Sequence, residues 1–203
     1  MSVGVPGTRC PRRSYVLVRM PRVHPRRASR AADLVCARGG GPVADVGCGT
    51  GRIAGHLREL GLDEFGIDLA PGMIDVARRH HPGARFDVGS MTDLTLGDAS
   101  VTGLVAWYSL IHVPDDGISS VPAHFRRVLR PGGPLLLSFH VGDESRLKTE
   151  GYGGHPMKVC VHRRQHRRTI EWLDEAGFAV ETHKTLTSAE SELGGIVLAR
   201  RQP

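Results

Sequence analysis

The sequence predicts an α/β fold: a three-layer α/β/α sandwich around a mostly parallel seven-stranded sheet with an antiparallel last strand. Five apolar stretches each end in a turn and lead into a helical pattern. This alternation is typical of a parallel sheet with helices on both faces. The last two apolar stretches are joined only by the short link SAESELGG, so the final strand is expected to run antiparallel to its neighbour.

The expected strands begin with the apolar run at 43–46, and the others are 64–69, 84–88, 101–108, 135–139, 178–186 and 196–200. The expected helices are 28–38, 52–60, one that starts at Ala70-Pro71, one within 115–129, and 165–176. Gly61 and Gly177 follow two of these helices, as is typical of helix ends. The segment 140–155 contains four glycines and is predicted to be a long loop of the kind that often acts as a lid.

Composition narrows the class of protein. The chain has 203 residues, 40% of them hydrophobic, which is enough for one domain with a single core. Its four cysteines are far apart and form no CxxC pair, so neither a disulfide framework nor a zinc ribbon is supported. No apolar run approaches the length of a membrane span, and no secretory leader is evident. We therefore expect a cytoplasmic protein that does not insert into membranes.

The net charge of +6 is concentrated near the N-terminus. Residues 1–42 contain nine arginines and one acid, a balance of +8, which leaves about −2 for the rest. Residues 1–27 are also rich in proline and poor in large apolar side chains, so we expect a disordered basic tail. The folded domain is then 28–203, and its lack of net positive charge argues against nucleic acid as a partner. The sequence does not indicate an oligomeric state.

The chain is organised around VADVGCGTGR at 43–52, an apolar strand followed by glycines 47, 49 and 51. Glycines let the backbone turn tightly and come close to a ligand, although such turns also occur for conformational reasons alone. Asp68 lies 21 residues after Gly47, at the end of the expected second strand. A carboxylate there can accept hydrogen bonds from ribose hydroxyls, and a solvated aspartate at a strand end is the alternative.

Two common nucleotide motifs do not fit this turn. A dinucleotide-binding GxGxxG fingerprint requires glycine at position 52, where the chain has Arg52. The lysine of a phosphate-binding GxxxxGK[ST] loop is also missing. The turn is therefore not expected to hold a phosphate.

Five motifs together resemble a known family. VADVGCGTG, GIDLAPGMIDVAR, VGSMTDL, GLVAWYSLIHV and VLRPGGPLLLSF are similar, in order and spacing, to the class I S-adenosylmethionine-dependent methyltransferases. The closest likeness is to a bacterial subgroup with the WYSLIH signature that acts on small molecules. The resemblance covers about 30–201 and implies a Rossmann-like fold, S-adenosylmethionine as cofactor and methyl transfer to a small-molecule substrate.

The resemblance also implies roles for individual residues. The turn formed by Gly47, Cys48, Gly49 and Gly51 would hold the methionyl part of the cofactor, with Asp45 organising its amino group or a water. Asp68 would bind the ribose hydroxyls. The other residues expected around the cofactor are Leu69, Met73, Gly89, Ser90, Met91, Ala106 and Trp107. The tyrosine-bearing N-terminal helix that is usual in the family is not evident, because Tyr15 is followed by VLVRMP, which proline breaks.

Methyl transfer needs mainly alignment of the acceptor with the reactive methyl group, plus a base when the acceptor must lose a proton. His112, just past the expected fourth strand, is the candidate base, because the unperturbed pKa of histidine lies near neutrality. Packing against the next helix is an equally good interpretation. Tyr108 is a candidate for the acceptor pocket or for the core, and His140, at the end of the fifth strand, is a second pocket candidate.

His162 and His166 have the i, i+4 spacing of metal ligands on a helix. No acid or cysteine nearby completes a site, and arginines 163, 164, 167 and 168 surround them. The cluster therefore predicts a solvated basic face, and no metal site is expected.

Three functions are compatible with these observations. A methyltransferase for a small molecule agrees best with the five motifs, with RNA methylation as a minor variant. The second is a cofactor-binding protein that has lost catalysis, since the usual N-terminal lid is not recognised. The third is a NAD-dependent oxidoreductase, which the missing third glycine disfavours.

Overall fold

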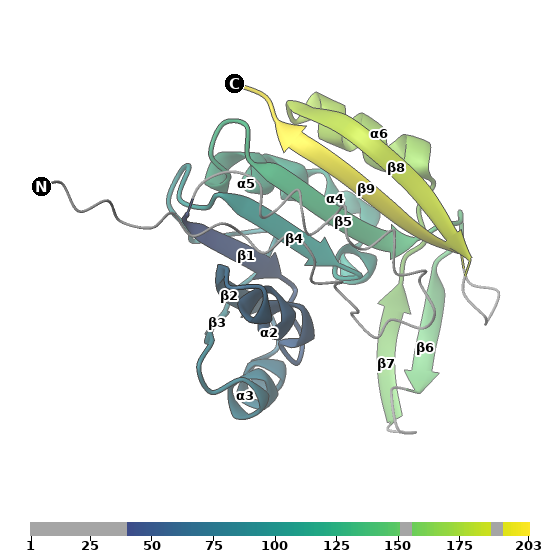
Figure 1. Ribbon diagram of the computed structural model, residues 1–203. Helices are drawn as coiled ribbons and strands as arrows, with labels where there is room; N and C mark the ends of the chain where they lie inside the picture. The colour runs from purple at the N-terminus through teal and green to yellow at the C-terminus, as the bar shows by residue number, and fades with distance from the viewer. Residues whose placement is uncertain (1–39, 151–155, 188–192) are drawn as a thin grey trace, which may run out of the picture.

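The computed structural model describes residues 40–150, 156–187 and 193–203. The predicted helix over 28–38, the basic tail at 1–27 and part of the segment 140–155 therefore lie wholly or partly outside the described residues. The main sheet has seven strands in the order β3-β2-β1-β4-β5-β9-β8 (Figure 1). Its strands are β1 (Pro42–Val46), β2 (Asp63–Asp68), β3 (Arg85–Val88), β4 (Gly103–Trp107), β5 (Pro134–His140), β8 (Phe178–Thr187) and β9 (Leu193–Arg201).

Strands β1 to β5 pair in parallel, whereas β9 runs antiparallel to both of its neighbours, β5 and β8. The predicted fold class is thus confirmed, including the antiparallel last strand. The central strands consist mainly of buried residues: Leu135, Leu136 and Leu137 of β5 are all at most 7% exposed. Such continuous apolar strands are expected where helices cover both faces of a sheet.

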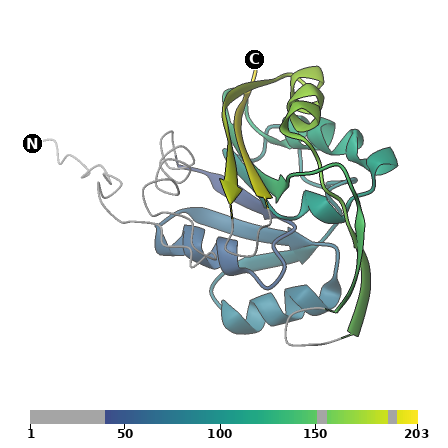
Figure 2. The ribbon, with the colours of Figure 1, turned by 90° about the vertical axis from the view of Figure 1, so that its right-hand side faces the viewer.

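The helices form two outer layers. Helices α2 (Arg52–Glu59) and α3 (Pro71–His80) lie on one face of the sheet (Figures 1 and 2). Helices α4 (Asp115–Ile118), α5 (Ser120–Val128) and α6 (His166–Glu175) lie on the other face. The predicted helix within 115–129 is therefore two helices that meet at Ser119. None of the helices in the described ranges is long and apolar enough to cross a bilayer.

The predicted loop at 140–155 is wrong in part, because a hairpin begins within it. Strand β6 (Arg146–Glu150) pairs antiparallel with β7 (Pro156–Val161) as a separate two-stranded sheet. Figure 1 shows this hairpin projecting from the edge at which β5 ends. The glycines of the segment concealed the short alternating patterns on either side of them, and β-branched residues are few, with Thr149 in β6 and Val159 and Val161 in β7.

Glycines with left-handed backbone begin and end helix α2. Gly51 precedes the helix with φ of 82°, and Gly61 follows it with φ of 79°. The two positions differ in what surrounds them. A Cβ on Gly51 would lie 2.7 Å from the Phe86 ring, whereas a Cβ on Gly61 would have nothing within 4 Å.

This difference predicts the stability of two alanine variants. Gly61→Ala is expected to cost about 1 kcal/mol, because alanine resists the left-handed conformation. Gly51→Ala pays the same backbone cost and also displaces Phe86, so its total cost should be about 2 to 4 kcal/mol. Urea unfolding of both variants measures the difference, and equal costs would contradict the packing argument.

Candidate functional site

The candidate residues gather at the edge of the sheet where the parallel strands end. Strand order reverses at β1, since β2 lies on one side of it and β4 on the other. The chain leaving β1 passes into α2, which contacts β2 and β1, while the chain leaving β4 leads to α4 and α5 on the other face of the sheet (Figures 1 and 2). Open α/β sheets bind ligands in the crevice at such a reversal.

The three glycines of the turn after β1 have different roles, although all have positive φ. A Cβ on Gly47 would lie 2.2 Å from the side chain of Ser109, and a Cβ on Gly51 would meet Phe86. These two glycines allow close packing inside the protein. Gly49 has nothing within 4 Å of its Cβ position, so it is the glycine of the turn whose backbone a ligand can approach.

Asp45 is a carboxylic acid buried in β1, only 1% exposed. Its Oδ2 accepts a hydrogen bond of 3.0 Å from the backbone N–H of Ala54, in the first turn of α2. Its Oδ1 is buried and has no hydrogen-bond partner among the described residues. Burial raises the pKa of the Asp45 carboxyl from 3.8 to about 7, although the Ala54 N–H and Arg52 oppose the shift. Asp45 is therefore a buried acid just before the glycine turn, with one carboxyl oxygen that lacks a hydrogen-bond partner among the described residues.

Asp68 ends β2 and joins the two loops that border the crevice. Its Oδ2 accepts a hydrogen bond of 2.8 Å from the Gly49 N–H, and its Oδ1 accepts one of 2.9 Å from the Ala70 N–H. Each carboxylate oxygen has a second lone pair that can accept another hydrogen bond. The carboxylate is therefore fixed in place and can still receive two donors from a ligand.

Exposed apolar side chains surround Asp68. Leu69 is 70% exposed, Val88 53% and Met73 46%, and these are three of the four large hydrophobic residues exposed in the described chain. Met91 lies beside the glycine turn, with its Cε 3.2 Å from the Cβ position of Gly47. Nearby, Ser90 bonds to Thr92 at 2.7 Å, and Gly89 N–H bonds to the Asp68 carbonyl at 3.0 Å. This cluster could receive a flat apolar group beside the carboxylate.

Two of the predicted residues turn their side chains into the protein. Cys48 is 8% exposed, and its Sγ lies 2.8 Å from the Cβ position of Gly66. Burial raises the pKa of this thiol, so it is an unreactive side chain that offers a ligand only its backbone. Ala106 is fully buried in the main core. Trp107 is half-buried, and its Nε1 has no partner among the described residues.

Tyr108 and His140 lie together. Their ring centroids are 4.9 Å apart. Tyr108 has φ of 50°, a conformation that is uncommon for a non-glycine residue and often marks a functional site. Its hydroxyl lies 2.3 Å from the Cβ position of Gly194, so a side chain at 194 would displace it. The two residues therefore join the ends of β4, β5 and β9.

His112 ends the short 3₁₀ helix η1 (Leu110–His112), which follows β4. The side chain is exposed, and its Nδ1 lies 3.3 Å from the backbone carbonyl of Cys160 on β7. A carbonyl only accepts hydrogen bonds, so the Nδ1 must carry the proton. In the neutral ring, Nε2 is then left with a lone pair, as a general base requires.

The predicted basic face around His162 and His166 is wrong in one respect. Arg167 and Arg168 are exposed and pair with Glu171, as expected, but Arg164 is buried, with 6% exposure. Helix α6 begins only at His166, so the two histidines do not share a helix face. His166 packs on Phe139, and its pKa is lowered by burial and by His183. Within the described ranges, no cluster of side chains suitable for a metal ion is found.

Sequence reasoning missed two serines near the crevice. The hydroxyls of Ser109 and Ser138 are buried and, in the described chain, have no hydrogen-bond partner. Ser138 pairs in register with Trp107, so both lie on the sheet face that also carries Asp45. Both serines lie in apolar segments, SLI and LLLSF. An isolated hydroxyl group in an apolar segment is the only feature of the sequence that could have indicated them.

Comparison with known proteins connects this site to a family. Residues 43–133 match the family model described as "Methyltransferase domain". A curated relative, the malonyl-[acyl-carrier protein] O-methyltransferase of Serratia marcescens, is 35% identical over 99 residues. The alignment covers 49% of this chain and 38% of the relative, so the chain spans less than half of that protein. Residues 43–133, less than half of the chain, are thus similar to methyltransferase domains, as the sequence motifs predicted.

Solved structures confirm the fold over a longer range. A S-adenosylmethionine-dependent methyltransferase from Methanosarcina mazei has a TM-score of 0.72 at 21% identity, covering 81% of this chain and 94% of that one. The 1,6-didemethyltoxoflavin-N1-methyltransferase of Burkholderia thailandensis was solved with bound 1,6-didemethyltoxoflavin and S-adenosylhomocysteine. It has a TM-score of 0.67 at 22% identity, with 88% of this chain and 78% of that chain covered.

The raised pKa of Asp45 predicts how stability depends on pH. The folded protein binds this proton more tightly than the unfolded chain, so the contribution of Asp45 to stability is fully present below pH 3.8 and is lost as pH rises to about 7. Asp45→Asn keeps an acceptor for the Ala54 N–H and cannot ionise. The free energy of unfolding of Asp45→Asn, relative to that of the wild type, should therefore increase with pH by up to about 1.4 kcal/mol per pH unit in this window.

Urea unfolding at several pH values between 4 and 8 measures this gain. Asp63→Asn, at the exposed start of β2, is the control and should follow the wild type. Parallel curves for Asp45→Asn and the wild type would show that the buried carboxyl has an ordinary pKa.

Proposed function

We propose that the chain is an S-adenosylmethionine-dependent methyltransferase that transfers a methyl group to a small-molecule acceptor. The observation that carries the proposal is the pair of carboxylates at the glycine turn: Asp68, which accepts a hydrogen bond from the Gly49 N–H, and Asp45, whose Oδ1 has no partner among the described residues. The family match over residues 43–133 and the S-adenosylhomocysteine bound in a protein of the same fold support it.

The residues at the crevice fit the chemistry of this cofactor. The unpartnered Oδ1 of Asp45 would receive the ammonium group of the methionyl part, whose positive charge would favour the ionised carboxyl. The free lone pairs of Asp68 would accept the two ribose hydroxyls. Leu69, Met73 and Met91 would contact the adenine ring. Cys48, Gly89, Ser90 and Ala106 would contribute backbone or packing around these groups, and Trp107 would border the methionyl part.

The protein's part in the reaction would be placement and proton removal. The cofactor supplies an electrophilic methyl group, so the acceptor atom needs mainly to be aligned with it. His112 would take a proton from the acceptor at Nε2, because its Nδ1 donates to the Cys160 carbonyl. Tyr108 and His140 would line the acceptor side, where β4 and β5 end.

The proposed acceptor class agrees with the WYSLIH subgroup that the sequence resembles. The relatives named above include an O-methyltransferase and an N-methyltransferase, so the acceptor atom differs among proteins of this fold. The cations of the described domain are largely paired with acids or carbonyls, as with Arg127, Arg164 and Arg200. This pattern favours a small acceptor over a nucleic acid, which would require a free basic surface.

Asp68→Ala tests the cofactor site. Removing an ionised acceptor from two ribose hydroxyls is expected to weaken S-adenosylhomocysteine binding about 10- to 100-fold, since a hydrogen bond to a charged group contributes roughly 1.5 to 3 kcal/mol. Calorimetry with S-adenosylhomocysteine measures the affinity. Asp63→Ala, at the opposite end of the same strand, is the matched control and should bind as the wild type does.

A ligand panel separates the alternatives. S-adenosylhomocysteine should raise the melting temperature of the wild type, because a ligand that binds only the folded state stabilises it. Stabilisation by NAD instead would favour an oxidoreductase and contradict the proposal. Binding of S-adenosylhomocysteine without methyl transfer to any acceptor in a metabolite library would favour a protein that has lost catalysis.

A further inference from the structure

Three alternate residues of one extended segment hold three consecutive residues of η1. The Cys160 carbonyl faces the His112 ring at 3.3 Å, and the His162 N–H donates to the Ile111 carbonyl at 2.8 Å. The Arg164 guanidinium donates to the Leu110 carbonyl at 3.0 Å. The segment thus runs antiparallel to η1 and fixes each of its residues by a separate contact. We call these three contacts the η1 tether.

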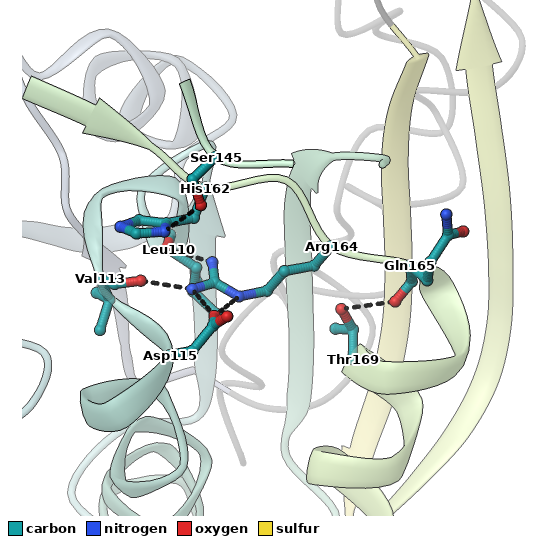
Figure 3. A network of polar contacts seen from close by, with 8 residues as sticks. All are labelled: Leu110, Val113, Asp115, Ser145, His162, Arg164, Gln165 and Thr169. Carbon is teal, nitrogen blue, oxygen red and sulfur yellow. Dashed lines mark hydrogen bonds and ion pairs between the residues drawn. The ribbon is translucent and has the colours of Figure 1, made fainter. Parts of the chain in front are cut away.

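Of the three residues of the segment, Arg164 is the one that contacts η1 through its side chain. Its guanidinium also donates to the Val113 carbonyl and to Asp115 Oδ1, at 2.8 Å for the ion pair (Figure 3). Its backbone N–H donates to the His140 carbonyl at the end of β5, at 2.9 Å. Arg164 therefore connects β5, η1 and the start of α4, which surround the proposed acceptor side.

The Arg164 contacts have the geometry that only arginine provides. Its planar fork donates several hydrogen bonds in fixed directions, whereas lysine has a single charged nitrogen. The Arg164 side chain is 5% exposed, but its Asp115 partner is 75% exposed. A buried cation that pairs with one exposed acid depends on the carbonyls for the rest of its stabilisation. Losing Arg164 would leave the carbonyls of Leu110 and Val113 without this donor.

We propose that Arg164 is a positioning residue for the acceptor side: through the η1 tether it holds His112 with its proton on Nδ1 and its Nε2 free. The base role of His112 rests on the proposed function, whereas the tether rests only on the three observed contacts. The proposed cofactor residues Asp45, Gly49 and Asp68 belong to β1, β2 and the loop after β1, and the two carboxylates accept their hydrogen bonds from N–H groups of the loops after β1 and β2 and of α2. Arg164 should therefore affect the acceptor side and leave cofactor binding unchanged.

The test compares Arg164→Met with Arg168→Met. Both arginines lie over the ring of Trp172, with guanidinium carbons 5.6 Å and 5.0 Å from its centroid. Arg168, however, pairs with Glu171 and is 58% exposed, so it is a matched control that lacks the tether. Arg164→Lys keeps the charge beside Asp115 but not the fork, and it replaces Arg164→Met if that variant does not fold.

Three measurements on the ligand-free and ligand-bound proteins decide the question. Nitrogen NMR of the His112 ring near pH 8, assigned with His112→Gln, should show the Nδ1 proton in the wild type and Arg168→Met, and mixed tautomers in Arg164→Met. The His162 amide should exchange at least about tenfold faster in Arg164→Met, while the Gly47 amide, bonded to the Ile67 carbonyl, stays unchanged. Affinity for S-adenosylhomocysteine should stay within about threefold.

An unchanged His112 tautomer and His162 exchange rate in folded Arg164→Met or Arg164→Lys would overturn the proposal. So would equal changes in Arg168→Met, or a loss of S-adenosylhomocysteine affinity as large as that of Asp68→Ala. If the wild type does not bind S-adenosylhomocysteine, the proposed function fails, and the NMR measurements still test whether Arg164 holds η1.

Discussion

The reversal of strand order at β1 is the constraint on which the rest of the site depends. Because β2 and β4 flank β1, the loops after β1 and β4 leave the sheet in different directions and create a crevice between them. The glycine turn fits into this crevice only because Gly47 has no Cβ where Ser109, from the loop after β4, packs. Topology and packing therefore place Asp45 and Asp68 on the same side of the sheet edge.

The two halves of the proposed site are built in different ways. The half proposed for the cofactor uses residues that lie in or next to β1 and β2, and backbone N–H groups fix both of its carboxylates. The acceptor half depends on contacts between distant segments, such as Arg164 with Leu110 and Cys160 with His112. A fixed cofactor half and a separately held acceptor half would let related chains change acceptors without losing the cofactor.

The fold could be predicted from the sequence, and candidates for the cofactor half could be named, because their signals are local. Apolar strands, the glycine turn and Asp68 at a strand end are each visible within about 30 residues. In the proposed acceptor half, His112, Tyr108 and His140 could be named as candidates from their places at strand ends. Arg164 could not, because it looks like one of several arginines on a basic face. Its partners Leu110, Val113 and Asp115 lie 49 to 54 residues earlier and are distinguished by no pattern. The hairpin was missed for a similar reason, since glycines interrupt its alternating pattern.

The most direct test of the account is a crystal structure of the protein with S-adenosylhomocysteine. The account predicts that the ligand's amino group lies within hydrogen-bond distance of Asp45 Oδ1, that both ribose hydroxyls contact Asp68, and that adenine lies among Leu69, Met73 and Met91. A ligand bound elsewhere, or in this crevice with neither carboxylate in contact, would contradict it.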